Sequence, residues 1–120
     1  MLKKAKQKNK VSGNIGESIA YYYVTKILKY KIIQTNYKNK LGELDIIATD
    51  GKSIFIIEVK RKNTLVFGFP REEVTSLKQQ KIKRCAILFL KENNLYEKVN
   101  VQFDVCEILG ENVNYIENAF

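Results

Sequence analysis

The stretch from Glu43 to Lys62, ELDIIATDGKSIFIIEVKRK, decides the fold because two apolar runs flank the dipeptide Asp50-Gly51. Both residues of this dipeptide tolerate the positive φ of a type I′ turn, so the stretch predicts a β-hairpin with strands at about 44–48 and 53–59. Charged residues stand inside the two apolar runs rather than in the turn: Glu43, Asp45, Glu58 and Lys60. An unpaired charge in a largely buried strand is costly, so these side chains need a physical reason.

A two-residue turn fixes which residues face each other across the hairpin. It pairs Thr49 with Lys52 and, further back, Glu43 with Glu58 and Asp45 with Ile56. Because side chains alternate along a strand, the three acids and Lys60 should project from one side of the sheet. The other side should be apolar and carry Leu44, Ile46, Phe55, Ile57 and Val59.

Two explanations account for the acids. A divalent cation such as Mg²⁺ or Mn²⁺ takes carboxylate oxygens, with waters and a substrate phosphate completing its shell, and it would relieve the repulsion between the acids. Alternatively, the acids form an exposed ladder of salt bridges on an edge strand, with Lys60 and Lys62 pairing with Glu58 and Glu43, which stabilises little. The metal gains support because the acids interrupt the most apolar segment of the chain.

The remaining elements follow from hydrophobic periodicity and turn signals. We predict a helix at about 14–29, a strand at 31–37, the hairpin as the central strands, a basic helix at 72–91 and a half-buried strand at 99–108. The second helix should bury one apolar set: Val74, Leu77, Ile82, Cys85, Ala86, Leu88 and Phe89. The order of helix, three strands, helix and strand predicts an α/β domain of about four strands.

Bulk properties restrict the class of protein. The 120 residues, with one proline and 45% hydrophobic residues, predict one domain over 13–120 after a flexible basic arm at 1–12. A net charge of +8 favours a polyanionic partner, although it could serve solubility alone. Cys85 and Cys106 lack metal-site spacing, and the lack of histidine removes Ser-His and Cys-His chemistry. Without a signal or membrane-spanning segment, we expect a cytoplasmic protein.

A family resemblance rests on five blocks in order: GNIGESIAYYYV, NYKNKLGELDIIA, FIIEVKRK, FGFPREEVTSLKQQKIKRCA and QFDV. Together they cover about residues 13–107 and resemble the YraN-type bacterial family, which is similar to archaeal Holliday-junction resolvases. Asp45, twelve intervening residues and Glu58-Val59-Lys60 resemble the D...(D/E)xK signature of the PD-(D/E)XK nuclease superfamily, with Leu44 where its proline would stand. The resemblance implies an α/β fold with an αβββαβ restriction-endonuclease-like core, a mixed sheet of about four strands flanked by helices.

The resemblance also implies roles for the acids. Asp45 and Glu58 match the metal ligands, and Lys60 matches the catalytic lysine. Glu17 matches the acid of the first helix and would add a ligand, although an acid in a first helical turn also complements the helix dipole. Glu43 matches the acid of the family's GExD block and joins the expected ligand set for Mg²⁺ or Mn²⁺.

Candidate contacts to nucleic acid lie mainly on the second helix. Lys78 and Gln79 match the KQ block of the family, while Lys78, Lys81 and Arg84 share a helix face that could follow a phosphate backbone. Lys62 adds a charge near the acids. An ordinary solvated helix face is the alternative. Three consecutive tyrosines, 21–23, are expected to bury one ring in the core rather than stack on bases.

Together these features predict a Mg²⁺-dependent endonuclease that hydrolyses DNA phosphodiester bonds, with structure-specific cutting as in resolvases. The alternative is a nucleic-acid-binding module on a nuclease-like scaffold that does not cleave. A third class, a protein-interaction or assembly factor, would use the same face to dock a partner. Symmetric cutting of two strands would favour a homodimer, and no membrane partner is expected.

Overall fold

The computed structural model describes residues 15–62 and 74–120, so the predicted arm at 1–12 and the loop with Gly68 and Pro70 lie outside the described residues. Helix α1 (Ile15–Tyr22) continues directly into a π-helical turn, η1 (Tyr23–Ile27). The other elements are β1 (Lys31–Asn39), β2 (Gly42–Thr49), β3 (Ser53–Lys62), α2 (Ser76–Glu92), β4 (Asn100–Leu109) and β5 (Asn112–Ile116).

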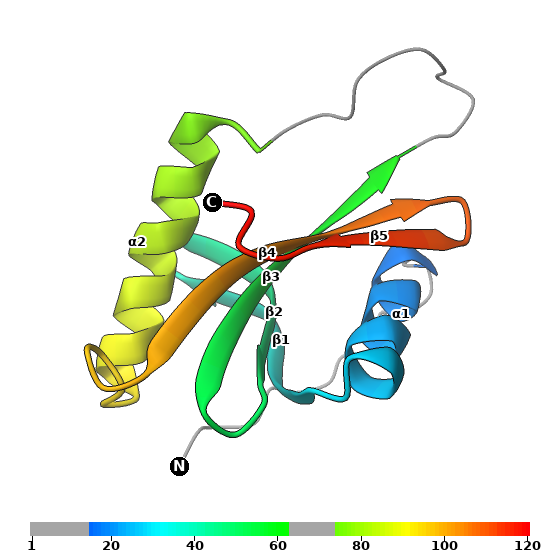
Figure 1. Cartoon of the computed structure of the whole chain (residues 1–120). Coiled ribbons are helices and arrows are strands. Elements are labelled where there is room, and N and C mark those ends of the chain that lie inside the picture. Colours follow the sequence, from blue (N-terminus) through cyan, green and yellow to red (C-terminus); the bar gives the residue numbers. More distant parts are fainter. Residues whose placement is uncertain (1–14, 63–73) are drawn as a thin grey trace.

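One mixed five-stranded sheet forms the centre of the fold, in the order β1-β2-β3-β4-β5. Strands β3 and β4 are parallel, and the other neighbours are antiparallel. Helices α1 and α2 lie on opposite sides of this sheet (Figure 1). A mixed α/β fold with flanking helices is therefore confirmed. Within the described ranges, no helix is both long and apolar enough to cross a membrane.

The sheet has one strand more than the predicted four. Strand β5 follows a turn at Gly110, whose φ of 66° suits glycine, and pairs with β4 from Val105 to Leu109. The short polar-apolar alternation of Asn112–Ile116 was the available signal for this strand. Because β5 covers its outer edge, β4 is an interior strand and is buried from Asp104 to Ile108, rather than half-buried throughout.

Two apolar cores lie on the two faces of the sheet. The α2 side packs Ile47, Ile54 and Ile56 against the helix stripe, and the α1 side packs Ile46, Phe55 and Ile57 against Ala20 and Val24. The prediction that the hairpin strands are buried on both faces is confirmed.

Leu44 was predicted on the face of Ile46, and this was wrong, because Leu44 belongs to the α2-side core. On β1, Leu44 pairs with Tyr37 and Ile46 pairs with Thr35. Between these two partners lies Asn36, which has a left-handed conformation with φ of 50°. The alternation of faces breaks at this point.

The hairpin turn is longer than predicted. Thr49 pairs with Ile54 rather than Lys52, because Asp50 Oδ1 accepts hydrogen bonds from the backbone N–H groups of Lys52 (2.9 Å) and Ser53 (2.8 Å). The register therefore shifts by two residues and sets Ile46 opposite Ile57. One step further along this register, Asp45 comes beside Glu58 and not beside Ile56. An even shift keeps Asp45 and Glu58 on the same side of the sheet.

The helices also differ in detail from the prediction. The first helix ends at Ile27, and α2 begins at Ser76 after an N-cap at Thr75. Leu77 was predicted to be buried with Ile82, but 64% of it is exposed. Five residues of α-helix rotate a side chain by about 140°, so Leu77 lies outside the buried stripe of Ile82, Cys85, Ala86 and Phe89.

Candidate metal centre

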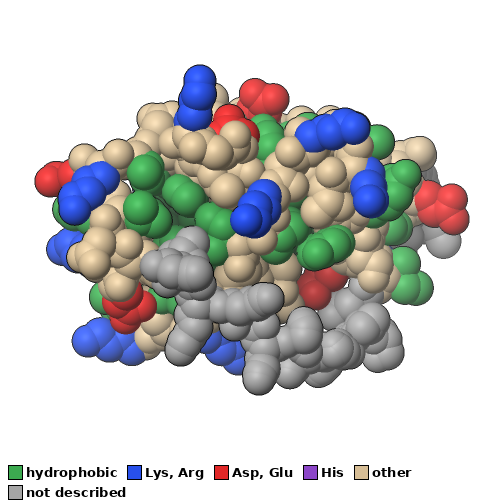
Figure 2. All heavy atoms as spheres, turned by 90° about the horizontal axis from the view of Figure 1, so that it is seen from below, with side chains coloured by type: hydrophobic (Ala, Val, Ile, Leu, Met, Phe, Trp, Pro, Cys, Tyr) green, Lys and Arg blue, Asp and Glu red, His purple; other side chains and the backbone are tan. Residues whose placement is uncertain are grey.

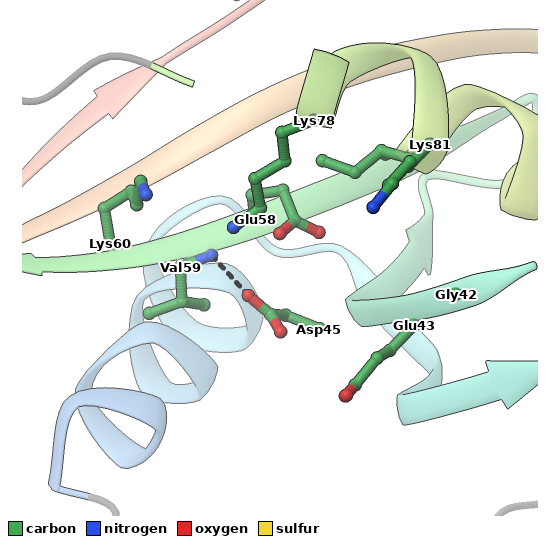
Figure 3. Close-up of a pocket in the computed structure, with 9 residues that line it drawn as sticks. Gly42, Glu43, Asp45, Glu58, Val59, Lys60, Lys78 and Lys81 are labelled. Carbon is green, nitrogen blue, oxygen red and sulfur yellow. Dashed lines mark hydrogen bonds between the residues drawn. The ribbon is translucent and has the colours of Figure 1, made fainter. Parts of the chain in front are cut away.

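A pocket opens where β2 and β3 separate. Ladder pairing between these strands ends at Ile46 and Ile57, while β3 continues beside β4 as far as Lys62. The resulting pocket has a volume of about 470 Å³ and is closed on one side by the beginning of α2 (Figure 3). Its lining is Gly42, Glu43, Asp45, Glu58, Val59, Lys60, Lys78, Lys81 and Ile82.

Asp45 bridges the separated strands with its side chain. The backbone N–H of Val59 donates to Asp45 Oδ2 at 2.8 Å, in place of a hydrogen bond between the two backbones. This bond fixes one oxygen of the carboxylate toward β3. It favours the ionised form, yet burial raises the pKa of Asp45 above its ordinary value, helped by the charges of Glu17 and Glu43.

Glu58 is the most unusual side chain of the pocket. It is only 6% exposed, and within the described residues its Oε2 has no hydrogen-bond partner. Burial, followed by the charge of Asp45, raises the pKa of Glu58 to about 8. A buried oxygen without a partner costs about 1 to 3 kcal/mol. Asp45, which is half-buried, and Glu58, which is buried, therefore form an acid pair in which one buried oxygen, Glu58 Oε2, lacks a hydrogen-bond donor among the described residues.

Three lysines surround this pair. Lys78 and Lys81 come from α2, and Lys60 comes from β3 two residues after Glu58. In Figure 3 the Lys78 and Lys81 side chains extend from α2 toward Glu58, whereas the Glu43 carboxylate points away from it. On the face in Figure 2, Lys and Arg side chains are scattered among apolar patches and form no continuous basic surface. Lys60, Lys78 and Lys81 thus bring three cationic side chains to one pocket.

The predicted set of four acids does not converge. In the described part of the chain, no three acidic, cysteine or histidine side chains are grouped closely enough to hold a metal ion. Glu43 is exposed at the pocket, and Glu17 is half-buried on α1 outside the pocket lining. Asp45 and Glu58 are thus the two acids that the fold brings together.

The alternative of an exposed salt-bridge ladder on an edge strand was wrong. Strand β3 lies between β2 and β4 in the sheet. Glu58 is buried on this interior strand rather than paired at a solvated surface.

The predicted nucleic-acid residues divide into two groups. Lys78 and Lys81 line the pocket, but Arg84, exposed on α2, and Lys62, at the end of β3, are not part of its lining. Gln79 instead donates from Nε2 to the carbonyl oxygen of Val74 at 2.9 Å, so it holds the segment that enters α2.

A second buried acid, Asp104 on β4, was not assigned a role from the sequence. It is fully buried and accepts hydrogen bonds from Tyr115 Oη, Gln102 Nε2 (3.0 Å) and the Asn118 N–H (2.9 Å). Asp104 is thus well satisfied and ties the chain after β5 to the sheet. The only available signal was an acid within the apolar alternation around QFDV.

The expectation that one of the three tyrosines is buried in the core is met only in part. Tyr23 is partly buried and stacks on Tyr115, with ring centroids 5.8 Å apart. Tyr21 and Tyr22 are exposed.

The fold and the pocket define a small mixed α/β protein with an acid pair between two diverging strands. The chain belongs to the uncharacterised protein family UPF0102, whose family model matches residues 16–108. This confirms the resemblance to the YraN-type family.

Several relatives match nearly full length. A UPF0102 protein of Thermodesulfovibrio yellowstonii is 43% identical over 109 residues, which cover 90% of this chain and 94% of that protein. One of Clostridium botulinum strain Hall is 41% identical over 118 residues, covering 93% and 95%. One of Geobacter sulfurreducens is 37% identical over 117 residues, covering 93% and 90%.

Proposed function

We propose that this protein is a metal-dependent endonuclease that hydrolyses DNA phosphodiester bonds on a PD-(D/E)XK, restriction-endonuclease-like core. The observation that carries the proposal is the buried Glu58 Oε2, which has no partner among the described residues and lies beside Asp45. The described elements also follow the order of helix, three strands, helix and strand. The two acids and Lys60 have the spacing of the superfamily signature.

The donor set fits a hard divalent cation. Mg²⁺ in phosphate-handling sites is typically held by one or two carboxylates, with waters and substrate phosphate as its other ligands, so Asp45 and Glu58 are sufficient protein ligands. Both carboxyls have raised pKa values, mainly through burial, and a cation would compensate for the lost solvation. When bound, such an ion supplies a water of lowered pKa and positive charge beside the phosphate.

The other residues of the chain position and stabilise charge. The Val59 N–H holds Asp45 across the gap between the strands, which limits its rotation. Lys60 lines the pocket two residues after Glu58 and would offset negative charge that develops on the phosphate. Lys81, exposed on α2, would contact a phosphate of the substrate.

The test is incubation of the purified protein with labelled duplex, single-stranded and four-way-junction DNA in the presence of Mg²⁺ or Mn²⁺. We expect cleavage of at least one substrate and its loss, by about 100-fold or more, in both Asp45→Asn and Glu58→Gln. Cleavage that is equal in all three proteins would contradict the assignment of the site. DNA binding without cleavage by the wild type would favour the non-catalytic binding module instead.

A further inference from the structure

Lys78 has an unfavourable place in its own helix. Its backbone N–H donates to the Oγ1 of the N-cap residue Thr75 at 3.2 Å, which puts Lys78 in the first turn of α2. The partial positive charge at a helix N-terminus favours acids there and disfavours cations. The first turn of α2 contains no acid that would offset the charge of this lysine. A residue that contradicts local preference in this way often serves a site.

The pocket explains this placement. Lys78 lines it together with Asp45 and Glu58, and in Figure 3 its side chain extends from α2 down to the acids. Among the nearby cations, Lys78 contributes most to lowering the pKa values of both carboxyls against the effect of burial. Lys81 lines the same pocket one helical turn later, and this makes it a matched comparison.

The Lys78 ammonium does not form a hydrogen bond with the buried oxygen of Glu58. Within the described residues Glu58 Oε2 accepts no hydrogen bond from Lys78 or any other group, and Lys78 is exposed. Its influence is exerted through space across the pocket. A long, exposed side chain of this kind can change its position at little energetic cost, because no close contact has to be broken.

We propose that Lys78 is a mobile counter-ion of the acid pair, which a divalent cation displaces so that the ammonium becomes free to bind a phosphate of the nucleic acid. This inference rests on the proposed function and concerns the regulation of the same site. In the metal-free protein the negative charge of the acid pair attracts Lys78. A divalent cation neutralises the pair, so the ammonium loses its attraction to the acids and is repelled by the cation.

The salt dependence of DNA binding tests this displacement. Each phosphate contact contributes about −0.9 to the slope of log K against log salt for duplex DNA. Affinities of wild type, Lys78→Met and Lys81→Met for a labelled duplex are measured over a range of KCl, with and without Ca²⁺, and a gel verifies that the DNA stays intact. We expect Ca²⁺ to steepen the slope of wild type and Lys81→Met by about 1 relative to Lys78→Met.

Two results would overturn the proposal. The first is that Ca²⁺ changes the slope of Lys78→Met and of wild type by the same amount. The second is that the slope of Lys78→Met is smaller than that of wild type by the same amount with and without Ca²⁺. Absence of salt-dependent DNA binding by the wild type would instead reject the proposed function. The counter-ion role is then decided by calorimetric titration with Ca²⁺ alone at pH 9. Binding several-fold tighter in Lys78→Met than in wild type and Lys81→Met supports it, and unchanged or weaker binding refutes it.

Discussion

Asp45 on β2 accepts a hydrogen bond from the backbone N–H of Val59 on β3, with 2.8 Å between Oδ2 and N, just beyond the last ladder pair of the two strands. A side chain thereby replaces a backbone acceptor where the sheet opens. The same carboxylate is both a structural bridge between the strands and one member of the acid pair.

Comparison of two substitutions separates these roles of Asp45. Asp45→Asn keeps an oxygen that can accept from Val59, whereas Asp45→Ala leaves that N–H without its partner. We expect Asp45→Ala to be less stable than Asp45→Asn by about 1 to 2 kcal/mol, measured by urea unfolding of the metal-free proteins. Equal stability of the two variants would mean that this hydrogen bond contributes nothing to the fold.

The buried carboxyl of Glu58 predicts an opposition between stability and function. Removing its ionisable group should stabilise the metal-free protein at pH 7 by about 1 to 3 kcal/mol, because burial and Asp45 disfavour the charged form. Urea unfolding of Glu58→Gln against wild type measures this gain. A variant that is less stable than wild type would show that Glu58 is satisfied in solution.

The same carboxyl predicts a pH dependence with a defined sign. Its folded pKa of about 8 lies above the reference value of 4.5, so the native state binds more protons than the unfolded chain between these values. The favourable contribution of the Glu58 carboxyl to the free energy of unfolding is therefore fully present below about pH 4.5, and it is lost as the pH rises through 8. The advantage of Glu58→Gln over wild type should grow across this window, by at most about 1.4 kcal/mol per pH unit.

Unfolding curves of both proteins at several pH values check this sign. Their difference reports the titration of the Asp45–Glu58 pair, because the groups outside the pair are common to both proteins. A constant or shrinking difference between pH 5 and 8 would contradict the raised pKa. Cation binding should strengthen over the same window, since it requires the ionised carboxylates.

Asp104 should matter for stability and not for the pocket. Tyr115→Phe removes one of its hydrogen bonds in a buried place and is expected to cost about 1 to 3 kcal/mol. Tyr22→Phe, on an exposed ring, should change stability by less than about 0.5 kcal/mol. Urea unfolding compares the two, and Mn²⁺ binding by folded Tyr115→Phe should match wild type. Weakened metal binding in this variant would connect Asp104 to the site.

The stripe on α2 predicts contrasting costs for two apolar residues. Ile82→Ala removes a side chain that is 3% exposed and should cost about 2 to 4 kcal/mol. Leu77→Ser, at 64% exposed, should change stability by less than about 0.5 kcal/mol. Chemical unfolding of both variants measures the contrast. A large loss in Leu77→Ser would mean that this leucine is covered in solution.

Much of the fold was predictable because its signals are local. Apolar alternation and helical spacing located both helices and four of the strands, and the run IFIIEV in β3 indicated burial on both faces. Strand β5 was not predicted because Asn112–Ile116 is short and rich in asparagine. The turn was misjudged because Asp-Gly favours a two-residue loop, whereas the Asp50 side chain here binds the N–H groups of Lys52 and Ser53.

The candidate site was predictable only in part. The spacing of Asp45, Glu58 and Lys60 located the pocket even though the register was wrong, because a shift by two residues preserves the face of a strand. Whether Glu17 and Glu43 reach the same point depends on how α1 packs and how β2 separates from β3. The position of Lys78 beside the acid pair likewise depends on where α2 begins. Such relations between elements are not encoded in local spacing.

The most direct measurement of the central claim is the binding of Mn²⁺ itself, by calorimetric titration of wild type, Glu58→Gln and Glu43→Gln at pH 8. We expect wild type to bind Mn²⁺ through the acid pair and Glu58→Gln to lose this binding. Glu43→Gln should retain it, because its carboxylate points away from Glu58. Mn²⁺ binding by Glu58→Gln with the affinity of wild type would contradict the claim.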